Sequence, residues 1–214
     1  MQAPRKGVLF VISGPSGVGK GTICKRLAEE VDGIALSVSC TTRHPRPLQD
    51  GGMEVNGVHY HFITPETFSR MIEEGDFYEY AHVHDDFYGT SRSFVGKQKE
   101  EGNDVILEID MQGALQVKAA DPEAVLIYIL PPSYEELEKR LIGRGSETPE
   151  KAKKRLHDAA SQLGYAYAYD YVLVNDDLDQ AVRAVENIIN VSRLRTAEMK
   201  NVIDQIRQSF KEVL

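Results

Sequence analysis

The chain has 214 residues, of which 42% are hydrophobic, and this suffices to bury one substantial core. Its 25 Lys and Arg residues are outnumbered by 33 Asp and Glu, so a net charge of −8 argues against nucleic acid or an acidic membrane as a partner. The two cysteines form no CxxC pair, which argues against a disulfide framework or zinc knuckle and favours a reducing cytoplasm. No apolar run approaches the ~20 residues that span a bilayer.

Short apolar runs alternate with longer amphipathic stretches, which is typical of an α/β fold with a mainly parallel sheet flanked by helices. Strands without polar alternation, as expected where both faces are covered, are predicted at residues 8–13, 104–109, 125–130 and 171–174. Helices are predicted at 22–31, at 133–142 behind a capping box, from 149 to about 164, and from 178 to the C-terminus.

The composition changes between about residues 41 and 96, where Pro, Gly, His and Tyr surround a helical stretch at 65–74. We interpret this region as a lobe inserted into a single domain, whose core comprises residues 1–40 and 97–214. The C-terminal segment has apolar residues at helical spacing, namely Val202, Ile203, Ile206 and Phe210. It predicts an amphipathic helix that packs on the core or forms a homo-oligomer.

A glycine-rich loop with the GxxxxGK pattern follows the first predicted strand and precedes a helix. It consists of Gly14, Pro15, Ser16, Gly17, Val18, Gly19 and Lys20. Backbone N–H groups of such a loop, the helix dipole and the lysine ammonium together bind nucleotide phosphates. Gly21 follows the lysine where a Mg²⁺-binding hydroxyl is usual, and Thr22 comes one position later. Magnesium would then be held largely through water and the phosphates themselves.

Two carboxylates are predicted at the C-terminal end of the strand at 104–109, where ligands of open α/β sheets bind. Glu108 lies within the strand and Asp110 follows it. Asp110 fits a Walker-B-like acid that could reach Mg²⁺ through water. The alternative is an ordinary aspartate that caps a helix.

Several segments together resemble the guanylate kinase family. They are the P-loop, SVSCTTRHPR (37–46), GVHYHF (57–62), EYA (79–81), YGT (88–90), IDMQG (109–113), LPPS (130–133), RLIGRG (140–145) and VND (174–176). The resemblance covers nearly the whole chain. It implies a kinase that transfers the γ-phosphoryl group of ATP to GMP, and by extension to dGMP, with Mg²⁺ bound to the ATP.

The resemblance implies that the inserted lobe binds GMP. Guanidinium and phenol groups would hold its phosphate: Arg43, Arg46, Tyr60 and Tyr88. Glu79 would accept hydrogen bonds from guanine N1 and N2, donors that adenine lacks. The remaining residues expected around GMP are polar or acidic: Ser39, Thr90, Glu108 and Asp110. Taken singly, each of these residues also fits an ordinary surface or strand position.

A further segment, at about 140–160, resembles the family's helical lid over ATP. Lys20, Arg46, Arg144 and Arg155 would stabilise the charge of the migrating phosphoryl group, and no nucleophilic side chain is needed. The resemblance also assigns Arg140 to the ATP site and Asn175 to the adenine. The arginines could instead pair with nearby glutamates, and Asn175 could be a plain turn residue.

Three other interpretations fit part of the sequence. A kinase of the same fold for a sugar bisphosphate or another nucleotide would share Lys20 and the lid arginines, but it would not need Glu79. A guanylate-kinase-like protein-binding module would not need Lys20 or Arg144. A metal site at His59 and His61, or at His82 and His84, has no third ligand nearby in the sequence.

Overall fold

The computed structural model describes residues 5–48, 51–83, 85–142 and 149–211. Within these ranges a five-stranded parallel sheet has the order β2-β7-β1-β8-β9. Its strands are β1 (Leu9–Ser13), β2 (Ile34–Leu36), β7 (Asp104–Glu108), β8 (Val125–Leu130) and β9 (Tyr171–Val174). Phe10 of β1 lies opposite Ile106 of β7 and Val125 of β8.

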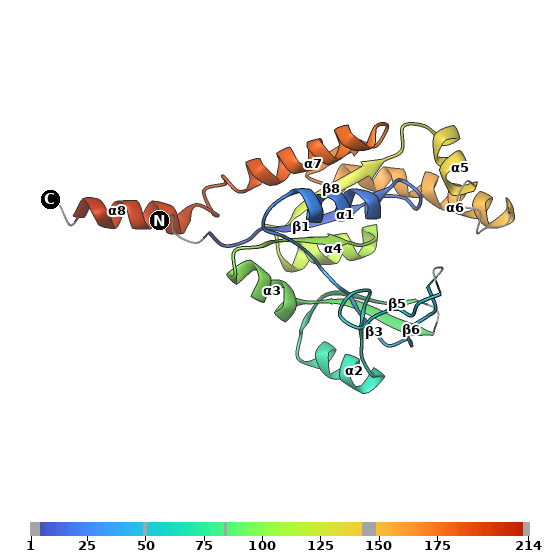
Figure 1. Ribbon diagram of the computed structural model, residues 1–214, viewed down its shortest axis with the longest axis horizontal. Helices are drawn as coiled ribbons and strands as arrows, with labels where there is room; N and C mark the ends of the chain where they lie inside the picture. Colours follow the sequence, from blue (N-terminus) through green and yellow to red (C-terminus); the bar gives the residue numbers. More distant parts are fainter. Residues whose placement is uncertain (1–4, 49–50, 84, 143–148, 212–214) are drawn as a thin grey trace.

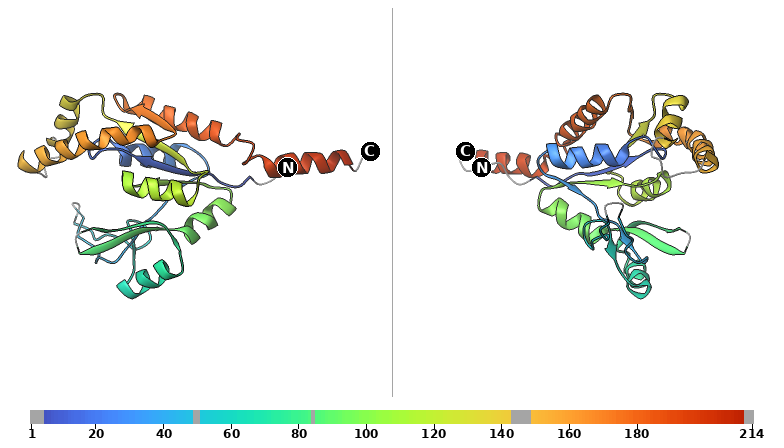
Figure 2. Two further views of the ribbon diagram at one scale, coloured as in Figure 1. Left: turned by 180° about the vertical axis from the view of Figure 1, so that it is seen from behind. Right: turned by 45° about the vertical axis from the view of Figure 1, so that its right-hand side comes forward.

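Helices cover both faces of this sheet, as expected from its uninterrupted apolar strands. Alternate residues of β1 point to opposite faces: Phe10 packs with α1 (Lys20–Glu30) and α7 (Leu178–Ser192), whereas Leu9 packs with α3 (Arg92–Glu100) and α4 (Met111–Ala120). Figures 1 and 2 show α1 and α7 on one side of the sheet and α3 and α4 on the other. The predicted α/β fold is confirmed.

A second, smaller sheet has the order β4-β3-β6-β5 and lies on the far side of α4 from the larger sheet (Figure 1). Its strands are β3 (Cys40–Thr41), β4 (His61–Phe62), β5 (Phe77–Val83) and β6 (Asp86–Ser91). Helix α2 (Pro65–Glu73) packs on it through Phe68, whose ring stacks on Phe77 with centroids 4.4 Å apart. These contacts form a small core separate from that of the larger sheet.

The remaining helices lie at the two ends of the molecule. At one end are α5 (Tyr134–Ile142) and α6 (Pro149–Gln162), and the 3₁₀-helix η1 (Leu163–Ala168) connects α6 to β9. At the other, α8 (Lys200–Lys211) extends away from the body of the protein (Figures 1 and 2). None of the described helices is long and apolar enough to cross a membrane.

The structure differs from the sequence-based predictions at several places. The prediction of one continuous helix from residue 178 to the C-terminus was wrong, because α7 ends at Ser192 and α8 begins at Lys200. Strand β2 was missed. Strand β9 is not covered on both faces: it lies at the edge of the sheet, and Val172 and Val174 are exposed. The capping box of α5 is half formed, since Ser133 accepts from the Glu136 N–H while the Glu136 carboxylate binds Arg140.

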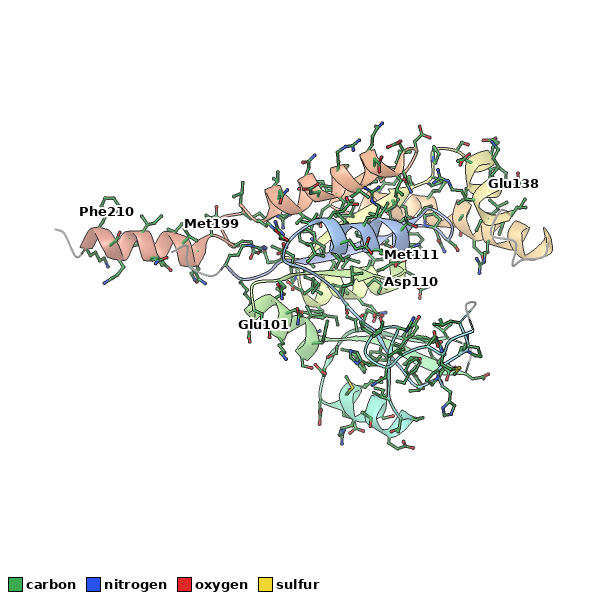
Figure 3. All side chains as sticks on the ribbon, in the orientation of Figure 1. Glu101, Asp110, Met111, Glu138, Met199 and Phe210 are labelled. Carbon is green, nitrogen blue, oxygen red and sulfur yellow. The ribbon has the colours of Figure 1, made fainter. Side chains whose placement is uncertain are left out.

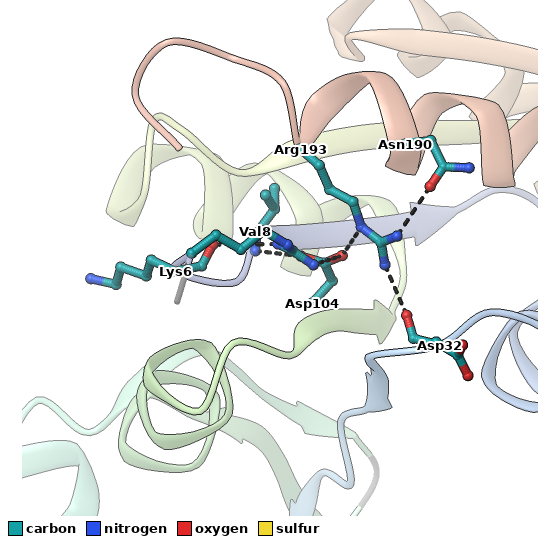
Figure 4. Close-up of polar contacts among 7 residues, drawn as sticks. Lys6, Val8, Asp32, Asp104, Asn190 and Arg193 are labelled. Atoms are coloured by element: carbon teal, nitrogen blue, oxygen red, sulfur yellow. Dashed lines mark hydrogen bonds and ion pairs between the residues drawn. The ribbon is translucent and has the colours of Figure 1, made fainter. Parts of the chain in front are cut away.

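A buried aspartate joins segments that are far apart in the sequence. Asp104, at the start of β7, is fully buried and accepts hydrogen bonds from the Val8 N–H and from the guanidinium groups of Arg5 and Arg193. Arg193 also donates to the Asp32 carbonyl and to Asn190 (Figure 4). This cluster fixes the C-terminal end of α7 to the N-terminal edge of the sheet.

Candidate active site

The P-loop connects β1 to α1 and has the geometry of an anion site. Gly14, Gly17 and Gly19 have φ values of 147°, 89° and 95°, which side chains rarely adopt. Lys20 closes the loop by donating to the carbonyls of Gly14 and Pro15, at 2.8 and 3.1 Å. In the described structure α1 has no side-chain cap, and its own first turn contains no acidic residue that would compete for its free N–H groups.

Helix α5 and the chain after β9 lie against this loop. A Cβ on Gly17 would come within 2.8 Å of Leu141, which shows how closely α5 approaches. Arg140 of α5 donates to the Asn175 carbonyl at 2.9 Å. Both line a cavity of about 440 Å³ together with Gly17, Gly19, Thr22, Asp176 and Leu178. The structure therefore brings the predicted ATP residues Arg140, Asn175 and Thr22 to the P-loop.

Helix α6, which lies in the predicted lid, contributes one described arginine to the loop. The Arg155 guanidinium of α6 lies 3.5 Å from the Ser16 hydroxyl. Arg144, the other predicted catalytic arginine of the lid, lies outside the described residues. The roles of both arginines stay predictions.

Two carboxylates lie near the P-loop. A Cβ on Gly21 would be 3.3 Å from a Glu108 oxygen, so this side chain borders the start of α1. Asp110 caps α4 by accepting from the Gly113 N–H at 2.9 Å. Helix α4 lies between the two sheets, and Asp110 and Met111 mark its first turn (Figure 3). The helix cap, weighed as an alternative for Asp110, is therefore present.

Arginine and tyrosine side chains come together on the smaller sheet. The Arg43 guanidinium is buried and lies 4.8 Å from the Tyr60 ring centroid, and the Tyr60 and Tyr88 rings are 5.8 Å apart. Arg46, by contrast, is exposed. These are the four groups predicted to hold the GMP phosphate.

Glu54 was missed by the sequence analysis, although it organises this group. Its two carboxylate oxygens bind the Arg43 guanidinium, and one also accepts from the Arg46 N–H at 2.8 Å. Hydrogen bonding to Arg43 and the Arg46 N–H lowers the pKa of Glu54 to about 2. A backbone bridge between Pro47 and Met53 returns the chain to this position. The only sequence signal was an acid placed shortly after two arginines.

Glu79 and Thr90 form a buried polar pair on adjacent strands. The Thr90 hydroxyl donates to Glu79 at 2.7 Å, and both residues are buried. Burial raises the pKa of Glu79, and the nearby Asp110 carboxylate adds to this rise. A Cβ on Gly113 of α4 would lie 3.2 Å from the second Glu79 oxygen. Ser39, half-buried, directly precedes β3. Glu79, with Thr90 bonded to it, therefore lies beside α4, whose N-cap is Asp110.

These features define a class of protein: a P-loop nucleotide-binding protein with a second polar site on an inserted sheet. The comparisons specify it further. The family model described as guanylate kinase matches residues 6–192. A guanylate kinase from Caldanaerobacter subterraneus subsp. tengcongensis is 50% identical over 208 residues, covering 97% of this chain and 98% of that protein. One from Clostridioides difficile is 47% identical over 210 residues, covering 98% of each.

A solved structure agrees with these relatives. The crystal structure of guanylate kinase from Anaplasma phagocytophilum matches with a TM-score of 0.70 and 33% identity over 92% of each chain. The chain belongs to the guanylate kinase family, and the resemblance inferred from the sequence is confirmed.

Proposed function

We propose that the protein is an ATP:GMP phosphotransferase, which converts ATP and GMP to ADP and GDP and also accepts dGMP. One observation carries this proposal: an intact P-loop occurs together with a buried glutamate, Glu79, on the inserted sheet of a guanylate kinase family member. Guanine offers the N1 and N2 donors that such a carboxylate accepts, whereas adenine does not. In this role the enzyme would recycle GMP in purine metabolism.

The P-loop and the lid would hold ATP. Backbone N–H groups of the loop and the Lys20 ammonium bind the phosphates, and the cavity beside Arg140 and Asn175 receives the nucleoside. Arg155, which already lies near Ser16, supplies positive charge as the phosphoryl group moves. Arg144 is assigned the same task from the sequence.

Magnesium would be carried by the ATP. Among the described residues no three His, Cys, Asp or Glu side chains lie together as a metal site. The nearby oxygen donors are the Glu108 carboxylate and the Thr22 hydroxyl, with Asp110 able to act through water, and this set suits an ion that keeps most of its hydration. When bound, Mg²⁺ would neutralise phosphate charge during transfer.

The acceptor would bind to the smaller sheet, with its base at Glu79, Thr90 and Ser39. Arg43, Arg46, Tyr60 and Tyr88 then bind its phosphate. Glu54 holds Arg43 in place before GMP arrives, which lowers the ordering cost of binding. A GMP phosphate oxygen attacks the γ-phosphorus directly, and the protein's contribution is to align the two nucleotides and exclude water.

The test is an ADP-release assay with ATP and Mg²⁺ that offers GMP, AMP, CMP, UMP and ribose 1,5-bisphosphate separately. Activity should be confined to GMP, and Glu79→Ala should lower kcat/KM for GMP by about 100-fold, because guanine donors lose a charged partner. Transfer to ribose bisphosphate would favour the sugar kinase interpretation. Binding of GMP without transfer to any acceptor would favour the protein-binding module.

Two further assignments follow from exposure and cysteine use. Both free thiols, Cys24 and Cys40, are buried, which suits the cytoplasm we propose.

On α8 the side chains of Ile206 and Phe210 are 53% and 65% exposed, and Phe210 projects from the helix into solvent (Figure 3). We assign this face to contact with a second copy, which light scattering at several protein concentrations would test.

A further inference from the structure

Asn175 makes a side-chain contact that an adenine-binding residue would not need. The residue follows β9 and is only 5% exposed. Its amide nitrogen donates to the Val18 carbonyl in the P-loop at 2.7 Å. Because a carbonyl can only accept, the NH₂ group must face Val18. One of the two N–H groups of the amide is thus committed to the P-loop backbone rather than to a ligand.

The orientation of one P-loop peptide depends on this contact. The Val18 carbonyl and the Gly19 N–H belong to the same planar, trans peptide unit and so point in opposite directions. When Asn175 holds the carbonyl on its own side, the Gly19 N–H must point away from Asn175. In an anion-binding nest, such an N–H is a donor to phosphate.

The position of Asn175 is itself fixed from two sides. Its backbone N–H donates to the Leu130 carbonyl at the end of β8, and its carbonyl accepts from Arg140 of α5. Arg140 is in turn paired with Glu136. Gly19 makes room for the amide, since a Cβ there would lie 2.6 Å from its nitrogen. Asn175 is therefore held in a fixed position between the C-terminal edge of the larger sheet and the P-loop.

We propose that Asn175 is a positioning residue for the triphosphate: it orients the Val18–Gly19 peptide so that the Gly19 N–H binds phosphate. This inference rests on the proposed kinase function but concerns only the donor half of the site. The proposal distinguishes two possible roles of Asn175. A residue that reads adenine affects ATP alone, whereas one that orients the P-loop affects every ligand with a triphosphate, whatever its base.

The experiment compares Asn175→Ala with Asn187→Ala, the same change at an exposed position of α7. Calorimetry with Mg²⁺ but without GMP measures binding of ATP, GTP and inorganic tripolyphosphate. Asn175→Ala should weaken all three by a similar factor of about ten, the value of one hydrogen bond near 1.4 kcal/mol. In turnover, KM for ATP should rise while KM for GMP stays unchanged. Asn187→Ala should match the wild type.

The outcomes distinguish the alternatives. Weaker ATP binding with unchanged tripolyphosphate binding would overturn the proposal in favour of adenine contact, and so would equal changes in both KM values, which indicate a general structural defect. If Asn175→Ala does not fold, Asn175→Leu tests the same contact with a side chain of similar size and no donor. A wild-type protein that fails to phosphorylate GMP would refute the proposed function but leave the tripolyphosphate comparison valid.

Discussion

At the residue scale, ionisation of Glu79 has opposite effects on the stability of the folded protein and on the proposed binding of guanine. Its carboxylate is buried next to a hydroxyl rather than a cation in the described structure, and burial raises its pKa from the usual 4.5. A carboxyl group with a raised folded-state pKa destabilises the folded protein when it is ionised, and this penalty disappears as the pH falls below that pKa. In the role we propose for Glu79, the same charge is what the guanine donors need.

Glu79→Gln should therefore raise the melting temperature of the ligand-free protein at neutral pH and raise KM for GMP by about tenfold or more. In the wild type, KM for GMP should also rise as the pH is lowered toward the raised pKa of Glu79, because protonation removes an acceptor. The rise should be smaller in the glutamine variant, where the GMP phosphate still titrates with a pKa of about 6, and the difference between the two pH profiles isolates Glu79. A lower melting temperature with unchanged KM would contradict this account.

Arg43, which we propose binds the GMP phosphate, keeps its carboxylate partner over this pH range. The pKa of Glu54 is lowered to about 2, so its contribution to stability is complete above its unfolded value of about 4.5 and is lost only as the pH falls toward 2. Its contact with Arg43 thus persists while Glu79 titrates. The Glu54–Arg43 contact therefore adds nothing to the expected change in KM, and the GMP phosphate, with a pKa of about 6, is the group that titrates alongside Glu79.

At the element scale, α4 contacts the smaller sheet through a glycine. Alanine normally stabilises a helix by about 1 kcal/mol relative to glycine. A Cβ on Gly113, however, would press on both Glu79 and Ile109 at 3.2 Å. Gly113→Ala should therefore bring little or no gain in stability and should raise KM for GMP several-fold by displacing Glu79.

The matched control is Gly96→Ala in α3, where a Cβ would meet nothing within 4 Å. This variant should gain up to about 1 kcal/mol in free energy of unfolding and keep the wild-type KM for GMP. Urea denaturation and steady-state kinetics on both variants make the comparison. If Gly113→Ala is stabilised as much as Gly96→Ala with normal kinetics, α4 does not constrain Glu79.

The elements that the sequence predicted well are those with strong local patterns. Strands β1, β7 and β8 are continuous apolar runs, and α2 is marked by its proline. Strand β2 spans only three residues, too few for a pattern. The interruption after Ser192 was missed because the apolar spacing resumes in α8 and the intervening segment contains no proline or glycine.

At the scale of the whole molecule, the candidate site contains residues that are contiguous in the sequence and residues that only the fold brings together. The P-loop is contiguous, so its residues could be identified from spacing alone. Asn175 and Val18 are 157 positions apart, and their contact depends on β9 joining the sheet next to β8. No pattern in either segment indicates the other. The assignment of Glu79 came from the family resemblance, and its burial against α4 came from the structure.

Asp104 also joins segments that are far apart in the sequence, but its cluster stabilises the fold and lies away from the candidate site. It begins β7, so its cluster lies at the N-terminal edge of a parallel sheet, opposite the C-terminal edge that carries the P-loop. Asp104→Asn keeps the shape but leaves Arg5 and Arg193 without their buried partner charge. The expected loss is about 3 kcal/mol in free energy of unfolding, measured in urea, with both KM values unchanged.

The more exposed pair of Arg26 and Asp179 provides the control, because it also joins segments far apart in the sequence, here α1 and α7. Asp179→Asn should change stability far less, since solvent screens an exposed pair. Equal losses of unfolding free energy in the two variants would mean that the burial of Asp104 adds nothing to stability. A loss of activity in Asp104→Asn at temperatures where it remains folded would mean that the two edges of the sheet are coupled. The parallel sheet would then transmit changes from its structural edge to its phosphate-binding edge.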